Sequence, residues 1–435
     1  MAMGLFRETR RGLSASALLL GGCLVPADPQ AANLPAKGAA PADYVSACFT
    51  HRAGFFTIPG TDTCLRIGGR VRAEFRYLDP GTRADDAVGS RARGRIDLDA
   101  RTRTDHGLLR AKMRYELTRN TGNYGPDTTS LEEAYVQFGG LTAGRLQSFF
   151  DFYTNDENFA AVTVSDLKTN VLAYTAMFGS DLSATLSLED SIERRQFAAP
   201  NGLGFPGEGF TSAGARVPDL VGQLLWEPDW GKAQLSAALH QIRSDNLVPG
   251  SGPTPFVNTE YGFAVQAGLQ VDLPMLAEED QFWLQAVYAE GALSYVGFGD
   301  TSIKEIDLGQ TDAYVDALGR ARRSRGWAAA ARFVHYWTPQ IRQVVFGSYG
   351  VVEYPGGSIV TTAAGGTLGF PDTTDWRIGS NLGWLPVSGL YLGVEAFYRH
   401  VDPRGRVFVD NDPVSGRLIG SADVVEARLR VQRDF

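Results

Sequence analysis

A chain of 435 residues has room for two or three soluble domains, so its length alone decides little. Its hydrophobic content of 44% is ordinary, and its formal net charge of −8 argues against a nucleic-acid partner. Downstream of the N-terminus no stretch holds about 18 consecutive apolar residues, which disfavours a helical membrane protein. Fifty glycines and 24 phenylalanines indicate β structure with many turns.

The N-terminal segment has the features of a secretory signal peptide. Three arginines within the first eleven residues precede an apolar run over residues 13–20, and small residues follow. We expect residues 1–27 to be removed, with cleavage after Ala27 or as late as about residue 32. The alternative is a lipoprotein processing site, which would make Cys23 a lipidated N-terminus. The Ala/Pro-rich residues 33–47 are then a flexible lead-in to a domain over residues 48–435.

Cys48 and Cys64 are the only cysteines that remain after such processing. Export to an oxidising compartment makes a disulfide between them the expected state, although two unpaired thiols are the alternative. A disulfide that closes a loop of this size stabilises the folded state by roughly 3 kcal/mol. Their spacing and the five scattered histidines disfavour a metal site, and we expect none.

Residues 64–77 alternate strictly between an apolar and a charged face. This period of two is that of a β-strand, and the length matches the roughly 9–11 residues of a strand that crosses a bilayer at a tilt. Residues 91–103 and 109–117 repeat the pattern. One face suits hydrocarbon and the other suits water, which predicts the wall of a water-filled barrel. The basic residues that we expect to line this pore are Arg66, Arg70, Arg72, Arg93, Arg95, Arg110 and Arg114.

Thirteen further segments read as strands, so we predict an all-β fold, a transmembrane antiparallel barrel of about 16 strands. They are residues 132–138, 141–149, 171–178, 182–189, 220–226, 233–242, 261–273, 282–290, 327–337, 341–351, 374–385, 390–400 and 424–435. Short turns alternate with long polar loops along the series, as in outer-membrane barrels. Sixteen strands are enough to enclose an aqueous channel.

Aromatic residues and the C-terminus support the membrane assignment. Trp226, Trp230, Trp337, Trp384 and Tyr391 lie near short turns, which predicts an interfacial girdle in contact with outer-membrane lipids. The last strand ends on an aromatic residue and must pair with the first to remove the open sheet edges. We expect that final residue, Phe435, to be recognised by the outer-membrane assembly machinery.

Three blocks of sequence resemble the alphaproteobacterial porins, which are general diffusion porins. They are residues 44–72, which contain GFFTIPGTDTCLRIGGRVR, residues 131–153 and residues 375–398. The resemblance covers essentially the whole mature chain. It implies a homotrimeric sixteen-stranded porin in the outer membrane of a Gram-negative bacterium. It also implies an inward-folded constriction loop, which here would lie between Ser148 and about Asn170.

The expected constriction loop is acidic. Asp151, Asp156, Glu157 and Asp166 would face the basic strands across a narrow passage, where opposed charges create a transverse field. The alternative is that these acidic and basic residues are ordinary solvated charges, placed anywhere along the barrel wall.

The predicted function is passive, cofactor-free diffusion of ions and small hydrophilic solutes. A substrate-selective porin is the nearest alternative, and a barrel enzyme or adhesin with a plugged lumen is a more distant one. No catalytic motif stands out: G-x-S-x-G is absent, and we expect no enzymatic activity.

Overall fold

A computed structural model of the chain describes residues 47–48, 54–197, 210–248, 256–299, 303–316, 318–409, 414 and 416–435. The expected signal peptide and most of the lead-in lie outside these residues. Within the described ranges no helix is both long and apolar enough to cross a membrane.

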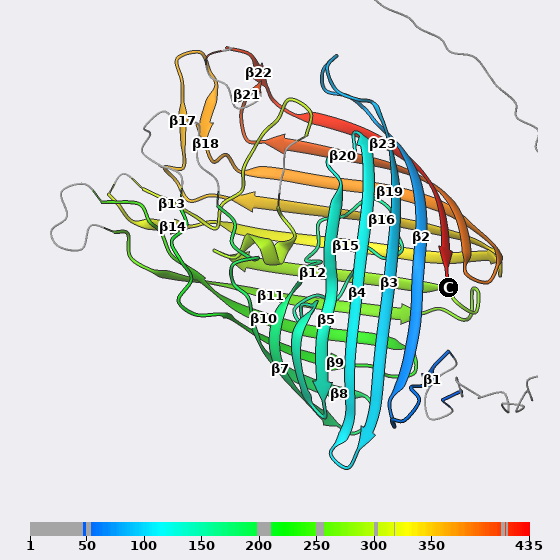
Figure 1. Ribbon diagram of the computed structural model, residues 1–435. Coiled ribbons are helices and arrows are strands. Elements are labelled where there is room, and N and C mark those ends of the chain that lie inside the picture. The colour runs from blue at the N-terminus through cyan, green and yellow to red at the C-terminus, as the bar shows by residue number, and fades with distance from the viewer. Residues whose placement is uncertain are drawn as a thin grey trace, which may run out of the picture. The chain divides into compact units, whose positions relative to one another are not determined.

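Sixteen antiparallel strands form a closed barrel (Figure 1), which confirms the number of strands read from the sequence. They are β2 (Cys64–Leu78), β3 (Val88–Thr104), β4 (Gly107–Gly122), β5 (Thr128–Phe138), β6 (Leu141–Gln147), β7 (Lys168–Phe178), β8 (Leu182–Glu189), β9 (Asp219–Trp226), β10 (Gly231–Ile242), β11 (Glu260–Asp272), β12 (Gln281–Glu290), β15 (Arg325–Thr338), β16 (Ile341–Glu353), β19 (Thr373–Val387), β20 (Leu390–Pro403) and β23 (Ala422–Asp434).

Shorter elements lie outside the barrel ladder. In the loops these are η1 (Leu293–Val296), β13 (Ala313–Val315), β14 (Ala321–Arg323), β17 (Ile359–Thr361), β18 (Thr367–Gly369), β21 (Val407–Phe408) and β22 (Leu418–Ile419). Strand β1 (Phe56–Thr57) pairs with the start of β2, where Cys64 forms the expected disulfide with Cys48.

The alternation of the first strand becomes two physically different surfaces. Ile67, Val71 and Phe75 are 55–59% exposed on the outside of the barrel, whereas Glu74 on the opposite face is 1% exposed. Because a barrel has no core on its outer side, an outer surface with these apolar side chains suits an apolar environment. The charged face of the same strand is therefore the lumen side.

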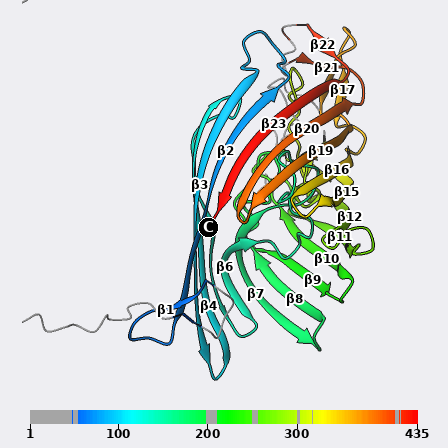
Figure 2. The same cartoon turned by 90° about the vertical axis from the view of Figure 1, so that its right-hand side faces the viewer.

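The barrel closes between its first and last strands. The register of β2 with β23 runs from Arg70 opposite Asp434 to Leu78 opposite Glu426, and Figure 2 shows the two strands side by side. Phe435 extends the ladder by one pair, because it exchanges two backbone hydrogen bonds of 3.0 Å with Gly69. A Cβ at Gly69 would lie 2.5 Å from Phe435 Cζ, so the aromatic ring requires glycine there.

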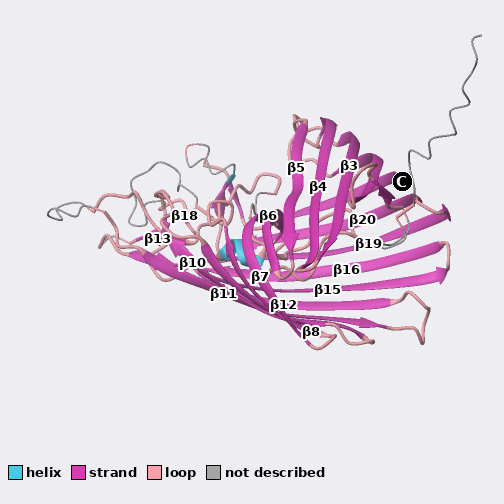
Figure 3. Ribbon diagram, turned by 60° about the horizontal axis from the view of Figure 1, so that its bottom comes forward, coloured by secondary structure: helices cyan, strands magenta, loops and turns pink. Residues whose placement is uncertain are grey.

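Part of the lumen is filled by loops. Helix η1, in cyan in Figure 3, packs with Phe150 and Phe298 against small inward-facing residues such as Ala264 and Ala289. Each fully buried aromatic of this kind contributes about 1.5–3 kcal/mol of hydrophobic stabilisation. The alanine and glycine positions of β11 to β16 thus make room for loop side chains, and water is excluded from this side.

One aromatic prediction is wrong. Trp226, Trp230, Trp337 and Trp384 are 41–62% exposed, as expected for a girdle, but Tyr391 is only 9% exposed. Its position on β20 has the same parity as the buried Glu395, so its ring points into the lumen.

Candidate functional site

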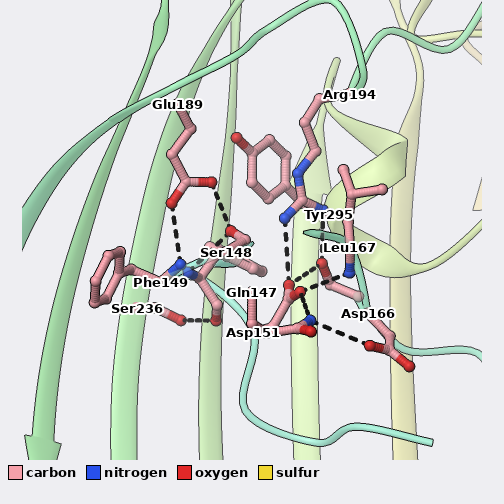
Figure 4. A network of polar contacts seen from close by, with 12 residues as sticks. Gln147, Ser148, Phe149, Asp151, Asp166, Leu167, Glu189, Arg194, Ser236 and Tyr295 are labelled. Carbon is pink, nitrogen blue, oxygen red and sulfur yellow. Dashed lines mark hydrogen bonds and ion pairs between the residues drawn. The ribbon is translucent and has the colours of Figure 1, made fainter. Parts of the chain in front are cut away.

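The loop between β6 and β7, residues 148–167, is anchored at its base by a buried ion pair. Asp151 and Arg194 are 7% and 1% exposed, and their side chains approach to 3.3 Å (Figure 4). Asp151 also accepts hydrogen bonds from the Ser165 hydroxyl and from the backbone N–H of Leu167 at 2.7 Å. Breaking such a buried pair is strongly destabilising, so Asp151 holds the loop's shape and does not face the passage.

A second carboxylate holds the chain where the loop leaves β6. Glu189 on β8 accepts hydrogen bonds from the Ser148 hydroxyl at 2.6 Å and from the Phe149 N–H at 3.0 Å (Figure 4). Ser236 on β10 donates to the Phe150 carbonyl at 2.7 Å. The loop is therefore directed along the inner wall from its first residues.

Asp166 also serves the loop itself. It accepts hydrogen bonds from the backbone and side-chain nitrogens of Asn155 at 3.1 and 3.0 Å, and from Gln147 at 3.1 Å. These contacts tie the two limbs of the loop together. Of the four acidic residues predicted for the constriction, Asp151 and Asp166 thus lie at its base.

The loop tip is fixed to the far wall of the barrel. The backbone N–H groups of Phe159 and Ala160 donate to Glu395 on β20 at 2.7 and 2.6 Å. Thr163 N–H donates to Ser348 on β16 at 2.9 Å. The loop therefore crosses from β6 to β20, and its tip faces residues of β2, β3, β4 and β23, where Arg428 donates to the Phe159 carbonyl.

A cavity of about 380 Å³ opens between the loop tip and this wall. Its lining combines residues of the loop, the first three strands and the last strands: Arg70, Arg72, Arg95, Arg114, Asp156, Glu157, Phe159, Arg342, Leu385, Tyr391, Arg430, Gln432 and Asp434. The structure thus brings two of the predicted acidic residues together with four of the predicted arginines. Six arginines face three carboxylates, so the cavity is net basic.

Arg342 and Arg430 are functional candidates that the sequence reading did not select. Arg342 on β16 forms an ion pair with Glu157, and Arg430 on β23 binds Glu74 at 2.6 Å. A signal for Arg430 existed, because it lies on the charged face of the last strand. Arg342 gave no comparable signal, because its strand is not rich in charge.

The other predicted arginines lie beside or below this cavity. Arg66 and Arg110 line a second cavity of about 380 Å³, which shares Arg70, Arg95, Arg114 and Asp434 with the first. In it Asp99 binds Arg110 at 2.9 Å. Arg93 is directly opposite Arg72 in the ladder and binds Glu116 at 3.2 Å.

A buried polar network joins strands β9 and β10 to the loop residues Tyr295 and Asp312. His240 Nδ1 lies 2.8 Å from Asp219, whose other oxygen accepts a hydrogen bond from the Tyr295 hydroxyl at 2.7 Å. His240 Nε2 faces Asp312 at 3.8 Å, and Asp312 accepts the Leu293 N–H at 2.7 Å. Burial raises the pKa of the Asp312 carboxyl and that of the Tyr295 hydroxyl. Carboxylates on both sides of the imidazole suit a structural tie between loops.

Comparison with known proteins agrees with this architecture. Porin Omp2b of Brucella canis is 27% identical over 277 residues, which cover 59% of this chain and 68% of that porin. Porin Omp2b of Brucella suis is 28% identical over 286 residues, with the same coverage. The crystal structure of the outer membrane channel DcaP of Acinetobacter baumannii has a similar fold, with a TM-score of 0.60 at 15% identity. That match covers 86% of this chain and 97% of DcaP.

The family model of the porin subfamily matches residues 34–425. This match spans nearly the whole chain and agrees with the closed sixteen-stranded barrel. The chain therefore belongs to the porin subfamily and is an outer-membrane channel of a Gram-negative bacterium for passive diffusion of solutes.

Proposed function

We propose that the cavity between loop 148–167 and the arginine wall is the constriction of the channel, and that it favours anions over cations. The observation that carries this proposal is its lining of six arginines and three carboxylates. Charged side chains that line a pore set its ion preference, and a surplus of guanidinium groups raises the local concentration of anions.

Side chains of opposite charge lie on the two sides of the proposed constriction. Asp156 and Glu157 project from the loop, and Arg72 and Arg95 project from the strands opposite. Such a separation orients water and favours small polar solutes over apolar ones of equal size. Glu157 and Arg342 form an ion pair and neutralise each other, so the net positive charge of the lining comes from the remaining arginines.

The size limit of the proposed constriction is tested by swelling of liposomes that contain the purified protein. Uncharged sugars of increasing size should enter at rates that fall steeply with size, because the loop narrows the passage. If these liposomes do not swell in any sugar, the lumen is blocked and the diffusion channel is refuted.

We further propose that the chain assembles as a homotrimer in contact with outer-membrane lipids and that Phe435 is the signal for its assembly. The exposed apolar faces of the strands, including Ile67, Val71 and Phe75, supply surface for both lipid and neighbouring subunits. A folded trimer should migrate slowly in a detergent gel and convert to a monomer on boiling. Migration as a monomer without boiling would contradict the trimer.

A further inference from the structure

Four arginines stand directly opposite one another on the first two barrel strands. In the ladder of β2 and β3, Arg70 is opposite Arg95 and Arg72 is opposite Arg93. Directly opposed side chains begin about 5 Å apart, and the next residue on the same face is about 7 Å further along the strand. These four residues, the arginine quartet, therefore place four guanidinium groups in one small patch of the lumen wall.

The quartet has too few counter-charges for its own neutralisation. Glu116 serves two of its members, since Arg95 and Arg93 both bind this carboxylate, the latter at 3.2 Å. Asp434 serves Arg70. Four cationic groups thus share two carboxylates.

Arg72 is the member without a carboxylate partner. Its Nε donates to the Gln432 side-chain oxygen at 2.9 Å, and no carboxylate of the described ranges lies within 4.0 Å of its guanidinium group. Glu74 is nearby on the same strand, but Arg430 holds it at 2.6 Å. Arg72 therefore has hydrogen-bond donors available for a ligand.

Three of the four arginines of the quartet line cavities of the lumen. Arg70 and Arg95 line both the constriction cavity and the cavity below it, and Arg72 lines the former. Each cavity has about 380 Å³, which leaves space for a small solute. Arg70 and Arg95 therefore lie where the two cavities meet, and Arg93 is directly opposite Arg72 in the ladder.

Like charges directly opposite one another destabilise a sheet, so folding alone gives no reason for these pairs. An arginine side chain presents a planar fork of donors that fits carboxylate and phosphate oxygens. A solute with two such groups would satisfy neighbouring forks at once and relieve the repulsion between them.

We propose that the arginine quartet is a binding site for multivalent oxyanions, that is, for solutes with two or more phosphate or carboxylate groups. The site rests on the proposed function, because it lies on the wall of the proposed constriction. It adds a saturable step to diffusion: a multivalent anion is retained briefly, whereas chloride passes.

The test is single-channel recording in potassium chloride with inorganic pyrophosphate or succinate added at constant ionic strength. Pyrophosphate, succinate or both should produce saturable block of the chloride current. The stronger blocker shows whether phosphate or carboxylate groups bind better. The double variant R72Q/R93Q should raise the half-blocking concentration about tenfold or more, because it removes two charge-assisted contacts. R72K, which keeps the charge but loses the fork, should give an intermediate value.

A matched control is R83Q/R119Q, which removes two exposed positive charges, one from the loop after β2 and one from the end of β4. Pyrophosphate and succinate should block this control at the same half-blocking concentrations as the wild type. Gel mobility without boiling shows that each variant is folded. Normal conductance without block by either anion, or equal block in the wild type and R72Q/R93Q, would overturn the binding site alone. A folded wild-type protein that inserts and never conducts would overturn the proposed function and the site together.

Discussion

Replacing Glu395 should loosen the tip of loop 148–167, which the contact of Thr163 with Ser348 and the ion pair of Glu157 with Arg342 would still hold near the barrel wall. The buried Glu395 carboxylate accepts the N–H groups of Phe159 and Ala160 at 2.7 and 2.6 Å, and Asn381 donates to it at 3.1 Å. Hydrogen bonds to charged groups contribute about 1.5–3 kcal/mol each. Lumen water can hydrate the freed N–H groups, so we take about half of the sum for the two backbone bonds, about 1.5–3 kcal/mol.

That free energy corresponds to a rise of roughly 10- to 150-fold in the ratio of loosened to docked loop tips. Single-channel recordings of E395A should therefore show more open-channel noise and excursions to higher conductance. E395Q is equally neutral but keeps one acceptor oxygen, so it should fall between E395A and the wild type. The comparison of these two variants separates anchoring from charge.

Glu227 offers a control for the loss of a carboxylate. It lies in the turn after β9 and binds Lys232 at 2.8 Å, far in the fold from the contacts of the loop tip. E227A should leave noise and conductance unchanged. If E395A records are indistinguishable from those of the wild type while the protein is folded, Glu395 does not hold the loop and our reasoning about the constriction is refuted.

Three other changes test separate parts of the structure. E157Q should shift the zero-current potential in the direction of higher anion selectivity, because it removes a negative charge from the constriction. An unchanged potential would place Glu157 outside the ion path. A Cβ at Gly268 would lie 2.1 Å from Phe152 Cδ1, so G268A should lower the free energy of unfolding by about 1–3 kcal/mol. The midpoint of unfolding in urea should fall accordingly. An unaltered midpoint would show that the Phe152 side chain moves aside without loss of stability. The double variant C48S/C64S should lose up to about 3 kcal/mol of stability yet keep its conductance, since the bridge joins only Cys48, which precedes β1, to the first residue of β2. Altered conductance would contradict that separation.

The barrel itself could be predicted from sequence because the lipid imposes a simple rule on every strand. Each residue that faces outward must be apolar, whereas the next residue of the same strand faces the lumen, where it meets water or packed loops. The resulting period of two is visible along the chain. The pairing of β2 with β23 follows from closure, since an open edge cannot remain in lipid. The disulfide followed from the count of cysteines and from export.

The path of loop 148–167 could not be predicted in the same way. Which acidic residue faces the channel depends on partners far away in sequence: Phe159 binds a residue 236 positions later, and Asp151 is buried by Arg194. Sequence composition treats Asp151 and Glu157 alike. The inward glycines and alanines of β11 to β16 were the available signal, because a wet wall has no need of so many small residues.

The most direct test of a basic constriction is the zero-current potential of the wild-type channel in a gradient of potassium chloride. The account predicts the sign of a channel more permeable to chloride than to potassium, because six arginines face three carboxylates in the cavity that we assign to the constriction. It also predicts that neutralising Arg72 and Arg95 lowers this preference. A wild-type potential of the opposite sign would contradict the central claim.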